Sequence, residues 1–169
     1  NEFVALLSFS VDQIEPTAPE PNILKVGSES KRDEFDWRTR LDKIEPGNTQ
    51  FQDYETICTD ILKYVLGDYL TLWNIQQKSN NGLYRFDLCC KIKSGADHDF
   101  FDTIKRYFNT KYIVFEFKNY KDEIGQEQIY TTEKYLYAKA LRCVAIIVSC
   151  NGSDENAKKA IKGTLRENG

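Results

Sequence analysis

The segment Lys111–Tyr120, with the sequence KYIVFEFKNY, determines which fold this chain can adopt. Its β-branched and aromatic residues predict a strand. Side chains alternate across a strand, so Glu116 and Lys118 share one face while Phe115 and Phe117 share the other. Charged groups late in an apolar strand cost free energy unless they are paired or bind a metal. We therefore expect a functional site at the end of this strand.

A second strand with a misplaced charge is predicted at Tyr84–Ile92, YRFDLCCKI. Asp87 lies on the face opposite the apolar residues, together with Arg85 and Cys89. Two carboxylates and one lysine thus occupy places that apolar groups would fill more easily. The apolar face of this strand is expected to consist of Phe86, Leu88, Cys90 and Ile92.

An acidic residue on one strand followed by Glu-x-Lys on the next resembles the PD-(D/E)xK nuclease superfamily, and FEFKN is similar to its Mrr-like branch. In this resemblance Asp87 is the first acid and Glu116-Phe117-Lys118 is the E-x-K motif. The resemblance runs from about Gln50 to the C-terminus. It implies an α/β protein with a restriction-endonuclease-like αβββαβ core, a central mixed sheet flanked by helices, and here an added N-terminal extension.

The resemblance also implies a metal site. Asp87, Glu116 and the backbone carbonyl of Phe117 would bind Mg²⁺ or Mn²⁺, and Glu55 on the first helix is a further candidate ligand. A divalent metal can activate water and relieve charge on the phosphate, and Mg²⁺ needs only one or two carboxylates. Lys118 would orient or deprotonate the attacking water, or neutralise developing charge. The competing interpretation is a Glu116–Lys118 ion pair at the strand rim, with Asp87 unrelated.

A glutamine on the next helix is the remaining catalytic candidate. The chain predicts a helix over Gln126–Leu141, and Mrr-like proteins often place a glutamine there, near the substrate phosphate or the lysine. We assign Gln128 this role. Gln126 and, in a shifted alignment, Thr131 are the alternatives.

The other elements follow from periodicity and capping signals. The helix at Gln50–Leu66 should begin after a cap at Asn48 or Thr49, and its apolar stripe includes Phe51 and Val65. Helices are also predicted at Asp33–Ile44, at Ser94–Thr110 with an apolar stripe at Phe100, Phe101, Ile104, Tyr107 and Phe108, and after a cap at Ser153 or Asp154. Strands are predicted at Tyr69–Gln76, where Leu70 and Leu72 share a face, and at Cys143–Cys150, with a turn at Lys78–Gly82.

The domain organisation predicted is an extension over residues 1–47 and a nuclease-like domain over residues 48–169. The extension combines a strand-like run at Asn1–Ile14, a proline-containing linker at Glu15–Lys31 and the short helix. The first run is either an added edge strand or the end of another domain. The chain contains no methionine, which predicts a piece of a longer protein.

Composition limits the classes of function. The net charge of -3 provides no polybasic signal, so nucleic-acid binding would depend on a local patch. Such a patch is offered by Lys158, Lys159 and Lys162 on the last helix, which either contact a phosphate backbone or form a solvated face. The five cysteines show no C-x-x-C pair, which argues against zinc and predicts a reducing, cytoplasmic setting. No apolar run is long enough to predict a membrane span.

The sequence thus predicts a Mg²⁺-dependent endonuclease acting on DNA rather than RNA, in restriction or anti-phage defence. A homodimer or a fused sensor domain would be its protein partner. Two alternatives remain open: the RNase or DNase tip of a larger bacterial toxin, and an inactive nuclease-like module that binds nucleic acid or protein.

Overall fold

The computed structural model describes residues 3–8, 36–79, 84–95 and 98–167. Its elements are β1 (Phe3–Ser8), α2 (Phe51–Leu66), β2 (Leu70–Ser79), β3 (Tyr84–Ile92), α3 (Asp99–Phe108), β4 (Tyr112–Lys118), α4 (Gln126–Glu133), the 3-10 helix η3 (Ala138–Ala140), β5 (Val144–Ser149) and α5 (Glu155–Glu167). A further helix covers residues 36–41. The α/β class is as predicted.

The five strands form one mixed sheet in the order β1-β5-β4-β3-β2. Strands β2, β3 and β4 are antiparallel neighbours, whereas β4, β5 and β1 run parallel. The parallel pair β4 and β5 needs a crossover, which α4 and the segment after it supply. All six residues of β5 are buried, as expected for a strand covered on both faces.

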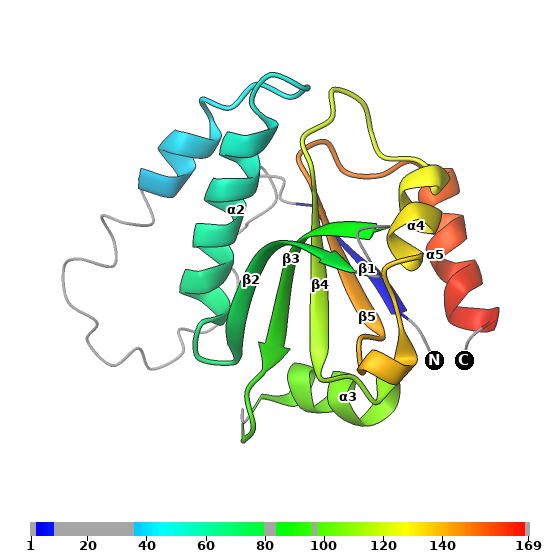
Figure 1. The fold of residues 1–169 in the computed structure, drawn as a ribbon. Coiled ribbons are helices and arrows are strands. Elements are labelled where there is room, and N and C mark those ends of the chain that lie inside the picture. Colours follow the sequence, from blue (N-terminus) through cyan, green and yellow to red (C-terminus); the bar gives the residue numbers. More distant parts are fainter. Residues whose placement is uncertain (1–2, 9–35, 80–83, 96–97, 168–169) are drawn as a thin grey trace, which may run out of the picture.

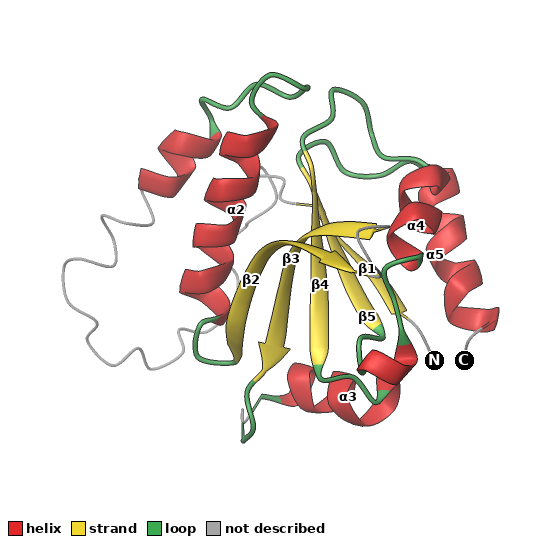
Figure 2. Ribbon diagram, in the orientation of Figure 1, coloured by secondary structure: helices red, strands yellow, loops and turns green. Residues whose placement is uncertain are grey.

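Helices cover both faces of the sheet (Figures 1 and 2). One apolar core lies between the sheet and helices α2 and α3, and it contains Ile113, Phe115 and Phe117 of β4. The second core lies on the face covered by α4 and α5 and contains Val114. The side-chain alternation predicted for β4 is therefore confirmed.

Helix α2 ends at Leu66 as predicted, but two expectations about it are wrong. Its N-cap is Gln50, without a side-chain cap, because the loop before it is fixed by tertiary hydrogen bonds: the Asn119 amide donates to the carbonyl oxygens of Glu45 (3.0 Å) and Gly47 (3.1 Å). Phe51 and Val65 are exposed, because the fully buried positions of the helix lie between Tyr54 and Leu62.

Strand β2 departs from simple alternation. Its pairing with β3 shifts register between Thr71 and Asn74, where Leu72 has a φ of 52°. Leu72 is therefore 52% exposed instead of sharing the buried face of Leu70. The strand also continues to Ser79, so Lys78 and Ser79 belong to β2 and not to the predicted turn, whose other residues lie outside the described part of the chain.

Helix α4 is shorter than predicted. It ends at Glu133 instead of Leu141, because the residues after Glu133 lead the chain back to the first residues of β4. There the Leu141 carbonyl accepts hydrogen bonds from the backbone N–H groups of Lys111 (2.8 Å) and Tyr112 (3.0 Å). In α3, Phe101 and Ile104 are buried, whereas Phe100 and Tyr107, which the predicted apolar stripe included, are exposed.

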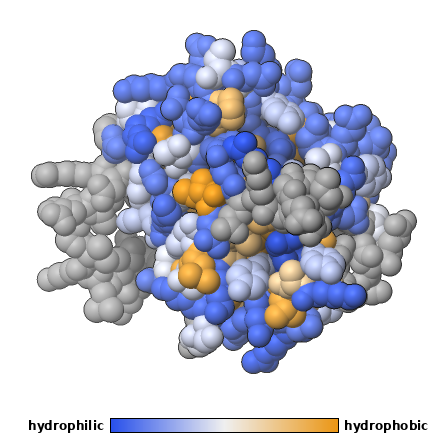
Figure 3. Space-filling model, in the orientation of Figure 1, coloured by the Kyte–Doolittle hydropathy of each residue, from blue (hydrophilic) through white to orange (hydrophobic). Residues whose placement is uncertain are grey.

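The N-terminal part joins the same sheet. Strand β1 pairs with β5 along its whole length, so the edge-strand alternative is the one observed. The predicted linker at Glu15–Lys31 lies outside the described residues. On the face shown in Figure 3, hydrophobic side chains form small separate patches among hydrophilic ones. In the part of the chain that the structure describes, no helix combines the length and hydropathy required to cross a membrane.

Candidate active site

The charged residues singled out in the sequence meet where β3 and β4 separate. The ladder between these strands runs from Lys91↔Tyr112 to Leu88↔Phe115, and Asp87 and Glu116 are the next residues beyond it. The Asp87 carboxylate accepts a hydrogen bond from the backbone N–H of Phe117 at 2.8 Å. The backbone N–H of Phe117 has no partner in the ladder between β3 and β4, so Asp87 satisfies this donor, and its carboxylate is thereby held against β4.

The separation of the strands also corrects one prediction. Phe86 does not share the core of Leu88, and instead belongs to the second core, where its ring contacts Tyr135 (centroids 6.3 Å apart) and lies 5.1 Å from the Arg142 guanidinium carbon. The residues of β3 that precede Leu88 are not paired with β4, so strict alternation does not hold for Phe86.

Glu116 and Lys118 form a largely buried ion pair. The Lys118 ammonium donates to Glu116 Oε1 at 2.8 Å. The side chain of Lys118 is 15% exposed and that of Glu116 is 5% exposed. The other carboxylate oxygen, Glu116 Oε2, is buried without a hydrogen-bond partner. Such an oxygen is costly in a folded protein and commonly indicates a ligand or a functional role.

The electrostatics of this cluster follow from burial. Burial raises the pKa of Glu116 to about 7 against the attraction of Lys118, and the charge of Asp87 adds to the rise. Burial likewise raises the pKa of Asp87, opposed by the Phe117 hydrogen bond and by Lys118. Burial alone would lower the pKa of Lys118, but the attraction and hydrogen bond of Glu116 outweigh it, so the pKa is raised. The pair therefore favours a protonated lysine.

Glu55 reaches the same region from α2. Its Oε2 accepts a hydrogen bond of 3.3 Å from the side-chain amide of Gln76 on β2. Burial raises the pKa of Glu55, the charge of Asp87 raises it further, and the bond from Gln76 opposes the rise. The predicted proximity of Glu55 to the acidic cluster is thus supported by its electrostatic interaction with Asp87.

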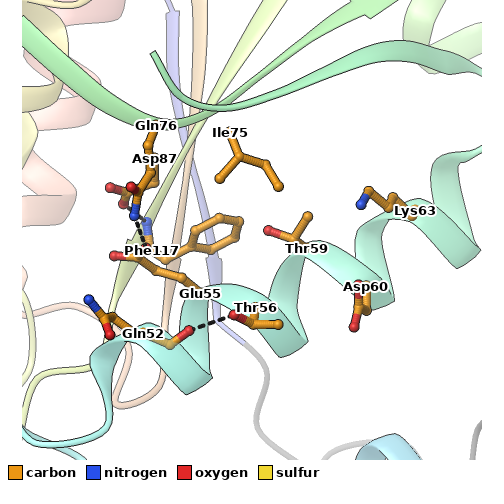
Figure 4. Close-up of a pocket in the computed structure, with 10 residues that line it drawn as sticks. All are labelled: Gln52, Glu55, Thr56, Thr59, Asp60, Lys63, Ile75, Gln76, Asp87 and Phe117. Atoms are coloured by element: carbon orange, nitrogen blue, oxygen red, sulfur yellow. Dashed lines mark hydrogen bonds between the residues drawn. The ribbon is translucent and has the colours of Figure 1, made fainter. Parts of the chain in front are cut away.

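A cleft of about 300 Å³ opens beside Asp87, between α2 and β2 (Figure 4). The α2 side chains line one wall, and Ile75 and Gln76 of β2 line the other. Asp87 and Phe117 close one end, as Figure 4 shows. Its lining consists of Gln52, Glu55, Thr56, Thr59, Asp60, Lys63, Ile75, Gln76, Asp87 and Phe117.

The remaining sequence candidates have local partners. Gln128 Oε1 accepts from the backbone N–H of Gly125 (2.9 Å) and so caps α4, while the alternatives Gln126 and Thr131 are exposed. On α5, Lys158 pairs with Glu155 at 2.8 Å, and Lys159 and Lys162 are exposed. The Asp154 cap of α5 is confirmed by its 2.7 Å bond to the Ala157 N–H.

Two neighbours of the cluster were missed by sequence reasoning. Tyr135 is 9% exposed, and burial together with the charge of Glu116 raises its pKa. It lies in the turn that was expected to be helix, so periodicity offered no signal for it. Asn119, next to Lys118 in the chain, is 4% exposed and anchors the loop before α2. Its position directly after the Glu-x-Lys segment was the available signal.

The residues present fit a metal that prefers oxygen ligands. Among the residues described, no group of three or more His, Cys, Asp or Glu side chains is placed to hold a metal ion. Mg²⁺ does not require such a group, because it retains waters and binds substrate oxygens alongside one or two carboxylates. Glu116 Oε2 is a buried acceptor without a partner, and Asp87 on β3 is close enough for its charge to raise the pKa of Glu116.

Comparison with known proteins identifies one similarity. The chain is 30% identical over 99 residues to a protein of Escherichia coli (strain K12) described as "Putative transposon gamma-delta 80.3 kDa protein". The match covers 58% of this chain and 14% of that protein. No protein-family model and no solved structure matches the chain.

Proposed function

We propose that this domain is a metal-dependent phosphodiesterase, an endonuclease that cleaves DNA. The observation that carries the proposal is the meeting of Asp87, Glu116 and Lys118 where β3 and β4 separate, with the buried oxygen Glu116 Oε2 left without a hydrogen-bond partner. Buried charges of this kind occur at sites whose function requires them.

The order of the elements supports the same proposal. Helix α2, strands β2 to β4, helix α4 and strand β5 follow one another as in an αβββαβ core, with α3 inserted before β4. The mixed pairing, antiparallel from β2 to β4 and parallel between β4 and β5, agrees with the restriction-endonuclease-like fold that the motif implies.

Asp87, Glu116 and the backbone carbonyl of Phe117 would hold Mg²⁺ or Mn²⁺. When bound, such an ion lowers the pKa of water and neutralises charge on a phosphate. The chain's own contribution is to fix the carboxylates: Asp87 through the N–H of Phe117, and Glu116 through Lys118. Because its pKa is raised, Lys118 is suited to neutralising charge on the phosphate rather than to acting as a base.

DNA is the substrate we favour. The similar E. coli protein is named for a transposon, which is a mobile DNA element, and this supports DNA over RNA. A role in restriction or anti-phage defence, with a sensor domain or a second copy as partner, belongs to the same proposal.

A second candidate is a nuclease-like module without activity that binds nucleic acid. It is favoured by the fact that Lys118 and Asp87 already have partners within the protein, as in a purely structural network.

One experiment separates these candidates. Supercoiled plasmid and total RNA are incubated with the protein in Mg²⁺, in Mn²⁺ and in EDTA, beside Asp87→Asn and the exposed-site control Glu127→Gln. Metal-dependent plasmid nicking that Asp87→Asn abolishes supports the DNA nuclease, whereas cleavage of RNA alone supports the toxin-type alternative. Stable binding without any cleavage supports the inactive module.

A further inference from the structure

The cleft between α2 and β2 shares Glu55, Asp87 and Phe117 with the proposed metal site, and the rest of its lining extends away from that site. Asp87 and Phe117 close the end nearest the cluster, and the lining extends along α2 from Gln52 to Lys63 (Figure 4). At about 1.5 Å per residue these positions are roughly 16 Å apart along the helix axis. A nucleic acid bound at Asp87 would therefore pass the mouth of this cleft.

The size of the cleft restricts what can enter it. A volume of about 300 Å³ is at the lower limit for small-molecule sites. A duplex is far too wide, since its major groove alone is about 12 Å across. A single extrahelical base matches the scale of such a space.

The charge of the lining argues for a base rather than a phosphate. Three carboxylates, of Glu55, Asp60 and Asp87, line the cleft with one lysine, Lys63. A phosphate would be repelled by this excess of negative charge, whereas a neutral heterocycle would not. Ile75, which is 55% exposed, provides an apolar surface on the β2 side for the flat face of a base.

The lining offers both hydrogen-bond acceptors and hydrogen-bond donors. The Thr56 hydroxyl donates to the Gln52 carbonyl at 2.8 Å, which leaves its lone pairs for a ligand. The carboxylate of Asp60 accepts when ionised, whereas the side chains of Gln52 and Lys63 carry N–H donors. The Watson–Crick edge of each base also presents donors and acceptors, so such a lining can hold a base.

The backbone of β2 supports a functional reading of the cleft. Gln76 has a φ of 51° and Leu72 one of 52°, and these residues flank the stretch that contains Ile75. Non-glycine residues rarely adopt this conformation, and such strain is retained mainly at functional sites. The distortion leaves Ile75 directed at the cleft, as Figure 4 shows.

From these features we propose that the α2–β2 cleft binds one unpaired base of the strand that is cut. The proposal rests on the nuclease function proposed above and specifies its substrate: DNA with an unpaired nucleotide beside the scissile phosphate. Extracting a paired base requires breaking its pairing and stacking, so duplexes are poorer substrates.

The test compares DNAs of one sequence that are fully paired, or carry a single unpaired cytosine, thymine or abasic site. We expect the cytosine and thymine substrates to be cut at least about tenfold faster than the duplex, and the abasic substrate to be cut more slowly than either. Thr56 is exposed and lines the cleft, so the larger side chain of Thr56→Phe should fill the cleft and abolish this preference. Val65 is exposed on the same helix but outside the lining, so Val65→Phe should retain the preference. The stabilisation of both variants by Mn²⁺ in a thermal-shift assay should equal that of wild type.

Equal cutting of the duplex and the cytosine substrate, or of the abasic and cytosine substrates, would overturn the proposal. If no DNA is cut, the same fluorescent DNAs are used in binding assays with Ca²⁺. A preference for unpaired cytosine that Thr56→Phe removes would then support base binding in the cleft while refuting the nuclease activity. Binding without any preference would refute both proposals.

Discussion

Replacing Glu116 by glutamine should change how the stability of the metal-free protein depends on pH. Burial raises the pKa of Glu116 from 4.5 to about 7. A carboxyl group whose pKa is higher in the folded state contributes stability below its unfolded pKa, and that contribution is lost as pH rises through the folded value. Wild type should therefore lose stability between about pH 4.5 and about pH 8 in EDTA.

The size of this loss follows from the shift. At about 1.4 kcal/mol per pKa unit, the rise to about 7 corresponds to roughly 3 kcal/mol. Solvent screening reduces it little, because the side chain is 5% exposed. The glutamine keeps an oxygen for Lys118 but adds an amide donor near the place of Oε2, at a cost of about 1–3 kcal/mol. The variant should thus be less stable than wild type near pH 5 and about as stable, or slightly more so, near pH 8.

Urea denaturation in EDTA, followed by the fluorescence of Trp37 and Trp73, measures both proteins across this range. Because wild type and variant share all other titrating groups, the contributions of those groups to the pH dependence of stability cancel to a first approximation. Glu127→Gln on the exposed surface of α4 is the matched control. Parallel stability curves for wild type and Glu116→Gln would refute the reasoning, since they would mean that Glu116 titrates alike in the folded and unfolded chains.

Three further predictions concern the metal and the reaction. Mg²⁺ at a hundredfold excess over its dissociation constant should stabilise wild type by about 2.7 kcal/mol, and Asp87→Asn should lose most of this increment in a thermal-shift assay; an unchanged increment would exclude Asp87 as a ligand. Lys118→Ala should slow cleavage by roughly 10²–10³ with a much smaller effect on DNA affinity measured by anisotropy, because phosphate contacts are many; equal losses would make Lys118 a binding contact only. Glu55→Gln should reduce plasmid nicking less than Glu116→Gln, since Glu55 is only half-buried. Unchanged nicking would mean that Glu55 is a solvated helix residue without a role in the reaction.

Much of the fold was predictable because its signals are local. The apolar run of β5, the alternation in β4 and the Asp154 cap of α5 are each set by residues a few positions apart, and each is observed. Predictions that depended on where an element stops were weaker. Helix α4 ends early because its chain must return to hydrogen-bond with Lys111 and Tyr112, which the helix-forming residues themselves do not reveal.

For the candidate site, the amino-acid sequence was enough to assign Asp87 to one strand and Glu116 and Lys118 to one face of the next predicted strand, because strand propensity and alternation are local properties. How these residues meet depends on the folded sheet: β3 pairs with β4 only from Leu88 onward, and Asp87, just before the first paired residue, accepts a hydrogen bond from the N–H of Phe117. The tertiary structure also decided that Gln76, in a left-handed conformation, bonds to Glu55 across a cleft. These contacts join residues 21 and 30 positions apart. Their geometry depends on strand twist, register shifts and helix placement, which arise only when the whole sheet packs.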